Sequence, residues 1–143
     1  MIEPEFLEIE AVMFLHDTAL QRYGGMPGVK HPGLLDSALA RPLNKVAYEP
    51  AGSFDLMDLA SAYAFGISRN HPFNDANKRT AWSCCALFLR ANDIALSAPE
   101  ADIIEQTVQL AQGTLSEQDF AAWLRTVTTP ATAATPSTAT PPE

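Results

Sequence analysis

The sequence has few basic residues and only two cysteines. Nine Lys and Arg stand against 17 Asp and Glu, a formal net charge of −8, so phosphate backbones and anionic lipid headgroups would be repelled. The cysteines, Cys84 and Cys85, are adjacent and match no metal-binding or redox spacing. No apolar run reaches the ~18 residues of a membrane span, and the acidic start is unlike a secretory signal. These features disfavour nucleic-acid and membrane binding and favour a protein of the reducing cytoplasm.

What is present is an ordinary globular composition, with 47% hydrophobic and 18% charged residues in 143. Apolar residues recur at intervals of three and four and alternating β-branched runs are few, so we predict a compact all-α bundle with little strand. We expect one domain over residues 1–127. Residues 128–143 are rich in Thr, Pro and Ala and hold no large apolar side chain, which predicts a disordered tail without a catalytic role.

Gly, Pro and polar loops separate the predicted helices. Proline should end the second helix at residue 41, and Ser97 with Glu100 should form a capping box for the fifth. The segment between the first two helices, GGMPGVKH, should be a flap or short hairpin. The third and fourth helices are apolar on most of their circumference and should be buried. The expected helices cover about residues 4–23, 33–41, 55–70, 80–92, 97–112 and 116–127.

The segment RNHPFNDANKR, at residues 69–79, joins the two buried helices and carries one third of the basic side chains. Because Pro72 disfavours helical geometry at the preceding residue, the third helix should end at about His71 and release that side chain into a loop. Phe73 would anchor the loop in the core. The loop then enters the N-terminus of a buried helix, whose free N–H groups and positive dipole end attract anions.

The residues that follow Phe73 suit a bound phosphate. Ala76 is small enough for a phosphate to approach the backbone, Asn77 offers an amide donor, and Lys78 and Arg79 add full charges. A carboxylate beside phosphates, here Asp75, is the usual way to hold Mg²⁺.

An imidazole completes this set of groups. His71, with an ordinary pKa of about 6.5, can accept a proton from a hydroxyl at cellular pH. Each of these residues alone has a common structural role, such as a helix cap or a solvated charge. Together, five polar groups at one buried junction would be costly without a ligand, and they fit transfer of a phosphorus group from a nucleotide to a hydroxyl.

The run HPFNDANKRTA resembles the signature of the Fic/Doc family, and specifically its Doc (death on curing) branch of toxins from type II toxin–antitoxin systems. Other segments, among them PGLLDSALARP and LSEQDFAAWL, extend the resemblance over about residues 24–124. It implies the Fic fold, with the signature loop between two buried central helices and at most a small flap hairpin.

The resemblance also implies a role for each loop residue. His71 would be the catalytic base and Asp75 the Mg²⁺ ligand, while Asn77 would shape an anion hole. Lys78 and Arg79 would hold the phosphates of ATP or another nucleoside triphosphate. Enzymes of the family that transfer AMP carry Gly where this chain has Lys78. As in Doc-like toxins, this difference implies transfer of the γ-phosphate, with a threonine of elongation factor Tu as target.

Control would come from a partner, because the self-inhibitory motif of many Fic enzymes is absent from the sequence. The resemblance implies a Phd-like antitoxin as that partner. Two alternatives stay open: AMP transfer to a protein hydroxyl, and a non-enzymatic module that binds only an antitoxin or a nucleotide.

Three further residues carry expectations. Ala76 should have a negative φ, because Ala at positive φ costs roughly 1 to 2 kcal/mol. His16 lies within a predicted helix and is more consistent with a structural than with a catalytic role. Arg69 is either a cation at a helix end or a phosphate contact.

Overall fold

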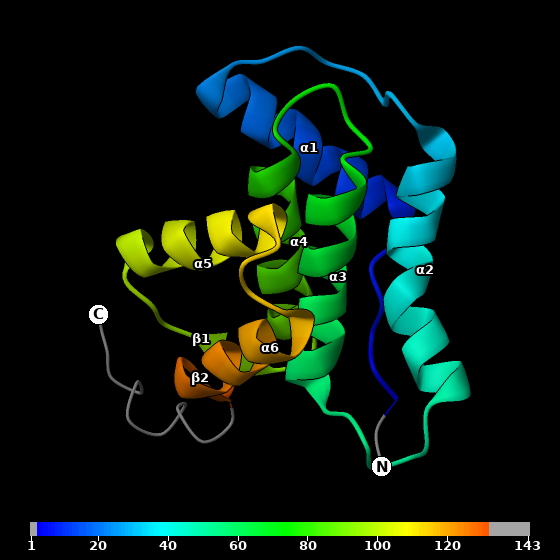
Figure 1. Ribbon diagram of the computed structural model, residues 1–143, viewed down its shortest axis with the longest axis vertical. Coiled ribbons are helices and arrows are strands. Elements are labelled where there is room, and N and C mark those ends of the chain that lie inside the picture. The colour runs from blue at the N-terminus through cyan, green and yellow to red at the C-terminus, as the bar shows by residue number, and fades with distance from the viewer. Residues whose placement is uncertain (1–2, 132–143) are drawn as a thin grey trace.

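The structure is a computed structural model that describes residues 3–131, an α-helical bundle with one small antiparallel sheet (Figure 1). This architecture confirms the all-α prediction. The elements, in chain order, are α1 (Ile9–Tyr23), α2 (Pro32–Tyr48), α3 (Leu56–Asn70), α4 (Asn77–Ala91), β1 (Ile94–Leu96), α5 (Glu100–Gln112), α6 (Glu117–Thr126) and β2 (Thr128–Pro130).

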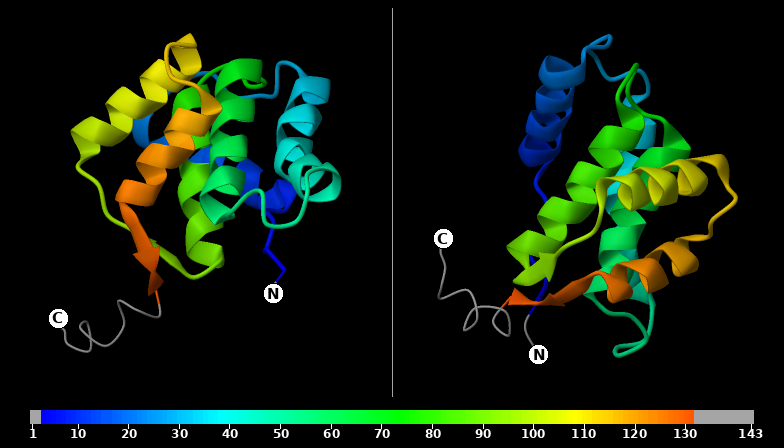
Figure 2. Two further views of the ribbon diagram at one scale, coloured as in Figure 1. Left: turned by 60° about the horizontal axis from the view of Figure 1, so that its bottom comes forward. Right: turned by 90° about the vertical axis from the view of Figure 1, so that its left-hand side faces the viewer.

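Helices α3 and α4 form the centre of the bundle, as predicted. Their apolar side chains, such as Ile67 of α3 and Phe88 of α4, are fully buried. Helix α1 lies on one side of this pair and α5 with α6 on the other, while α2 packs along α3 (Figure 2). Cys84 and Cys85 are unpaired and buried in the same core, and burial raises the pKa of the Cys84 thiol to about 12. The two thiols are therefore packing groups.

Helix α2 continues through Pro42 to Tyr48, so the predicted end before this proline is wrong. The Pro42 ring is buried and has no N–H to donate to the carbonyl of Ala38. Helix α3 approaches α2 at that turn, where a Cβ on Gly66 would lie 3.1 Å from the Ala38 oxygen. Close packing against α3 thus holds α2 together across the proline.

Helix α1 begins at Ile9, five residues later than predicted. The preceding residues are extended because their backbone bonds to side chains of the core helices. The Leu7 N–H donates to the Tyr63 hydroxyl at 3.0 Å, and the Phe6 ring lies 6.0 Å from that of Phe88. Tertiary contacts here replace the first turn that the sequence favoured.

Residues 128–130 form β2, which pairs antiparallel with β1. The first residues of the predicted tail thus form a strand, and residues 132–143 of that tail lie outside the described part of the chain. The same pairing explains a second difference. The Ser97 N–H donates to the Val127 carbonyl at 2.9 Å, and α5 begins at Glu100 without the predicted capping box.

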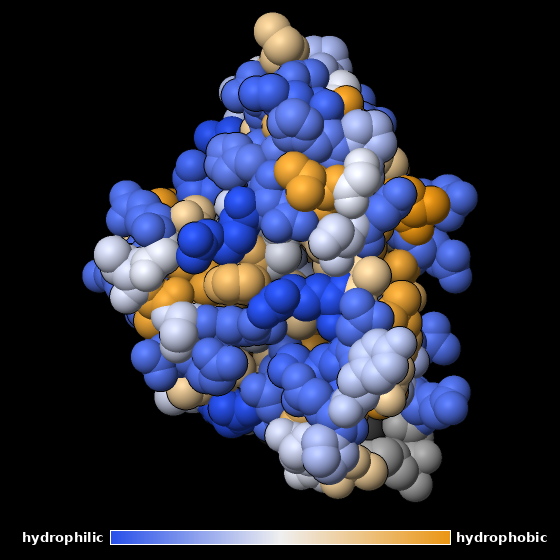
Figure 3. All heavy atoms as spheres, turned by 45° about the vertical axis from the view of Figure 1, so that its right-hand side comes forward, coloured by the Kyte–Doolittle hydropathy of each residue, from blue (hydrophilic) through white to orange (hydrophobic). Residues whose placement is uncertain are grey.

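Within residues 3–131, no helix is both long and apolar enough to span a membrane. The face turned forward in Figure 3 is mainly hydrophilic, with apolar side chains in separate small groups. Helix α2 contributes exposed apolar side chains at Leu34, Leu43 and Val46.

Candidate functional site

The α3–α4 junction is a short loop that leaves α3 at His71. The helix ends at Asn70, and His71 takes a left-handed conformation with φ of 51° that turns the chain out of the helix. Its side chain is exposed, whereas Phe73 is 1% exposed and anchors the loop in the core. Both predictions for this segment are confirmed.

A buried histidine of α1, His16, fixes the loop between α3 and α4 on its inner side. His16 is 1% exposed, and its Nε2–H donates to the backbone carbonyl of Asp75 at 2.9 Å. Its ring also stacks on Phe73, with centroids 3.9 Å apart and planes 13° apart. The predicted structural role of His16 is confirmed, and its partner proves to be the signature loop.

The segment of residues 24–31, which we call the flap, crosses over the loop from the other side (Figure 1). It forms no hairpin; instead, Val29 makes a single antiparallel bridge with Phe73. The Met26 N–H donates to Asp75 Oδ2 at 2.7 Å. A Cβ on Gly25 would come within 3.1 Å of the Asp75 Cβ, so only glycine lets the flap lie this close.

Asn77 organises the loop from inside. Its Oδ1 accepts from the Phe73 N–H at 2.9 Å, and its Nδ2 donates to the Phe73 carbonyl at 3.0 Å. The second Nδ2 hydrogen reaches His71 Nδ1, 3.2 Å away. Both amide hydrogens are thus used within the loop. Asn77 fixes the His71 ring through Nδ1, and no hydrogen bond to Nε2 is found among residues 3–131.

Helix α4 begins in a strained and uncapped way. Ala76, its N-cap, has φ of 64° and ψ of 29°, so the expected negative φ is wrong. The bonds to the Asp75 carbonyl and carboxylate, together with those of Asn77, hold the loop on both sides and impose this conformation at a cost of about 1 to 2 kcal/mol. Within residues 3–131, no side chain caps this helix start.

The first turn of α4 is basic. It contains Lys78 and Arg79 and no acidic residue, although the dipole of a helix favours acidic side chains at its N-terminus. In the described chain, the backbone N–H groups of residues 77–79 have no backbone acceptor. This helix start therefore offers both free donors and positive charge to an anion.

A cavity of about 780 Å³ opens at this junction, between the end of α1, the loop, the start of α4 and one side of α5. All six residues predicted for the site line it: His71, Asp75, Ala76, Asn77, Lys78 and Arg79. Arg69 does not line it. Its guanidinium lies 5.7 Å from the centroid of Phe65, so the structure favours the helix-end role for Arg69.

Other residues of the cavity wall were not foreseen. Arg22 and Tyr23 come from the end of α1, and Ile104 and Thr107 come from α5. The Arg79 guanidinium carbon lies 4.1 Å from the centroid of the Tyr23 ring. The Gly24–Gly25 pair in the sequence predicts the end of α1. It does not predict that this end lies beside the signature loop.

The carboxylate of Asp75 fits the ligand expected for Mg²⁺. Its Oδ2 accepts from Met26, and no hydrogen bond to Oδ1 is found among residues 3–131. The same residues contain no cluster of three metal-ligating side chains. Mg²⁺ commonly uses one or two carboxylates together with substrate phosphates and water, and Asp75 could supply one such carboxylate.

Comparisons with known proteins identify the family of the chain. The model of the Fic/DOC family matches residues 6–89, more than half of the chain. Protein kinase doc of Escherichia phage P1 is 39% identical over 117 residues, which is 81% of this chain and 90% of that protein. Toxin Doc of Mycolicibacterium smegmatis is 39% identical over 94 residues, 66% of this chain and 69% of that protein. These matches confirm the resemblance seen in the sequence.

Proposed function

The chain belongs to the Fic/Doc family, and from that membership we propose that it is a Doc-like toxin that transfers the γ-phosphate of ATP, or of another nucleoside triphosphate, to a protein hydroxyl. The observation that carries the proposal is a single cavity. It brings together an imidazole, a carboxylate and an uncapped, basic helix start. The name of the phage relative, a protein kinase, points to the same chemistry.

The nucleotide would bind with its phosphates at the first turn of α4. Backbone N–H groups of residues 77–79 donate to phosphate oxygens, and Lys78 and Arg79 balance their charge. The charges matter most as charge builds up on the transferred group and its leaving oxygen. Mg²⁺, held by Asp75 and the phosphates, would neutralise further negative charge when bound.

The target hydroxyl would lose its proton to Nε2 of His71. Its oxygen then forms a bond to the γ-phosphorus while the bond from that phosphorus to the β–γ bridging oxygen breaks, and a nucleoside diphosphate leaves. To accept at Nε2, the neutral ring carries its proton on Nδ1. In the resting structure Asn77 donates to Nδ1, so the ring proton is on Nε2. That proton must move to Nδ1, and the hydrogen bond from Asn77 must break, before Nε2 can act as the base.

Lys78 distinguishes this reaction from AMP transfer. A lysine in the first turn of α4 fills space and adds charge at the phosphate site. Enzymes of the family that transfer AMP carry Gly at this position, and the resemblance to Doc-like toxins implies that a terminal phosphate lies there. We propose phosphoryl transfer first and AMP transfer as the second candidate.

The partners follow from the same proposal. The protein acceptor is a threonine of elongation factor Tu, so that the reaction inhibits translation in the cytoplasm. A Phd-like antitoxin neutralises the toxin by inserting a helical segment into a surface groove.

Transfer of label decides between the candidate reactions. Purified protein is incubated with elongation factor Tu, Mg²⁺ and ATP labelled at either the γ or the α position, with and without a chelator. We expect label on the factor from γ-labelled ATP only, and none with the chelator. Label from the α position alone would establish AMP transfer instead. No label from either position, with an active factor, would leave only a binding role.

A further inference from the structure

Arg79 lies against an aromatic ring of α1 and not against a carboxylate. Arg125, by comparison, is paired with carboxylates, and its N–H groups donate to Asp55 at 2.8 and 3.0 Å and contact Asp58 at 2.9 Å. Arg79 makes no ion pair with any residue in the described range 3–131, although Asp75 lines the same cavity. Its guanidinium lies over the ring of Tyr23 instead.

The two kinds of contact leave an arginine with different capacities. A guanidinium has five N–H donors, all in its plane, and a carboxylate partner uses the donors along one edge. An aromatic ring attracts the cation through the electron-rich face of the ring, and this attraction does not require a hydrogen bond from the guanidinium. An arginine stacked on a ring therefore keeps its donors for a phosphate, whereas a salt-bridged arginine has already used two or three.

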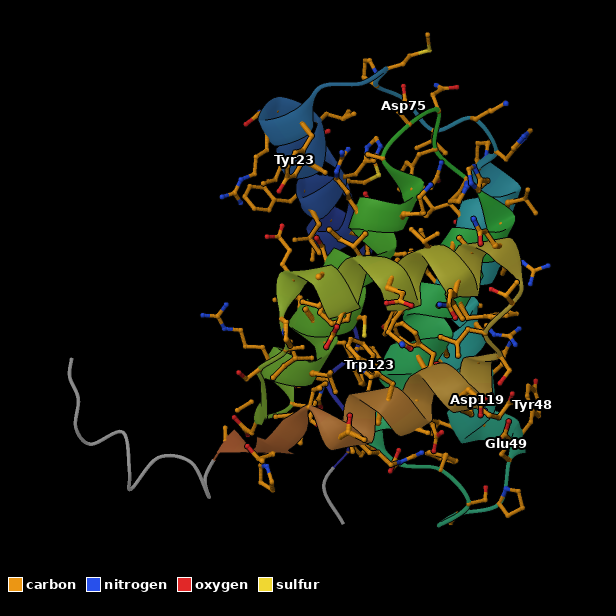
Figure 4. The ribbon with its side chains drawn as sticks, turned by 60° about the vertical axis from the view of Figure 1, so that its left-hand side comes forward. Tyr23, Tyr48, Glu49, Asp75, Asp119 and Trp123 are labelled. Atoms are coloured by element: carbon orange, nitrogen blue, oxygen red, sulfur yellow. The ribbon has the colours of Figure 1, made fainter. Side chains whose placement is uncertain are left out.

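We infer that Tyr23 is a positioning residue of the nucleotide pocket: its ring holds the Arg79 guanidinium at the wall of the cavity with its in-plane donors free for a triphosphate. The inference rests on the proposed function and adds a residue from α1 to it. Figure 4 shows Tyr23 at the same end of the molecule as Asp75, beside the signature loop. Tyr48, another exposed tyrosine, lies at the opposite end.

The ring of Tyr23, and not its hydroxyl, holds the Arg79 guanidinium. Tyr23 is 57% exposed, and no hydrogen bond of its hydroxyl is found in the described part of the chain. A phenylalanine should therefore keep the contact, and a leucine, which is apolar but has no ring, should lose it. Because an exposed cation–π contact is modest, the expected weakening of triphosphate binding is about two- to fivefold.

The test measures the affinity for Mg·ATP of the full chain by calorimetry, in the wild type and in Tyr23→Leu, Tyr23→Phe and Tyr48→Leu. The last variant is the matched control, since it removes an exposed tyrosine far from the cavity. We expect a two- to fivefold loss for Tyr23→Leu only. In an Arg79→Gln background, Tyr23→Leu should cause no further loss, because the tyrosine acts through the arginine.

Equal or tighter binding by Tyr23→Leu, with the wild type binding normally, overturns the inference and leaves the proposed function standing. Absence of Mg·ATP binding by the wild type overturns both. If Tyr23→Leu does not fold, nuclear magnetic resonance of the wild type decides. The side-chain Nε–H of Arg79 should be shifted upfield by the Tyr23 ring and remain so in Tyr23→Phe, and an unshifted resonance overturns the inference.

Discussion

The two central helices begin in opposite ways. Helix α3 starts with a capping box, in which Asp55 accepts from the Asp58 N–H and Asp58 accepts from the Asp55 N–H, both at 2.9 Å. Arg125 pairs with both carboxylates. Helix α4 starts at Ala76 in a left-handed conformation, without a side-chain cap in the described chain and with two cations in its first turn. The first arrangement is typical of stability and the second of binding.

The difference between the two helix starts indicates that a ligand binds at α4 and not at α3. At α3 the charges are already satisfied by neighbours, and a ligand would gain little. At α4 the backbone strain, the free N–H groups and the basic first turn all work against stability unless an anion binds. Strain of this kind is retained where surrounding contacts impose it, and here His16, Asn77 and the flap supply those contacts.

The largest expected effect comes from His71→Ala, which removes the proposed base. Phosphoryl transfer should fall by about 10²- to 10⁴-fold, the usual contribution of general base catalysis. The free energy of unfolding should fall by no more than about 1 kcal/mol, because the hydrogen bond from Asn77 is lost but His16 and Phe73 still anchor the loop. Rates from γ-labelled ATP and urea unfolding measure the two quantities.

His31→Ala serves as the control for that variant, since it removes an exposed histidine of the flap. It should leave the rate within about twofold of the wild type, a change of a few tenths of a kcal/mol. An equal loss of activity in both variants, or a large loss of stability in His71→Ala, would contradict a specific catalytic role for His71.

The start of α3 should respond in the opposite way. Asp55→Ala removes a cap and should lower the free energy of unfolding by about 1 to 2 kcal/mol at neutral pH, with phosphoryl transfer unchanged. Burial alone would raise the pKa of the Asp55 carboxyl, but hydrogen bonds from Arg125 and Asp58 outweigh it and hold the pKa below its ordinary value.

A lowered pKa sets the sign of the pH dependence. The stabilising contribution of Asp55 is complete above its unfolded pKa of about 3.9 and is lost as the pH falls through the lower folded value. The difference between the wild type and Asp55→Ala in urea unfolding should therefore shrink at pH 3 and below. A difference that is unchanged from neutral to acid pH would show that the carboxylate does not stabilise the helix.

The smallest expected effect is at Ala76. Ala76→Gly relieves the left-handed conformation and should raise the free energy of unfolding by up to about 1 kcal/mol, less the entropy that glycine loses on folding. Phosphoryl transfer should stay within about twofold, because the bonds that position the loop are unchanged. Thermal unfolding measures the gain, and a lower stability than the wild type would contradict the strain at α4.

Local chemistry allowed much of this to be predicted from the sequence. The end of α3 at His71 follows from the proline after it, and the burial of α3 and α4 follows from their apolar circumference. The residues that line the cavity from the signature loop were predicted because they are neighbours in sequence, so one loop suffices to bring them together.

What could not be predicted depends on contacts between distant segments. His16 and Asp75 are 59 positions apart, and no local pattern pairs them. The positive φ of Ala76 is imposed by such contacts, since an isolated alanine prefers a negative φ. Pro42 likewise stays within α2 because α3 packs closely against that turn, which outweighs the local preference for a helix end.

The most direct test of the central claim is a titration of the protein with Mg·ATP followed by nuclear magnetic resonance of the backbone amides. We expect saturable shifts of the N–H groups of Asn77, Lys78 and Arg79 at the start of α4. We expect no change at Leu56, Met57 and Asp58, where α3 begins. Saturation without shifts at the start of α4, or with equal shifts at both helix starts, would contradict the central claim.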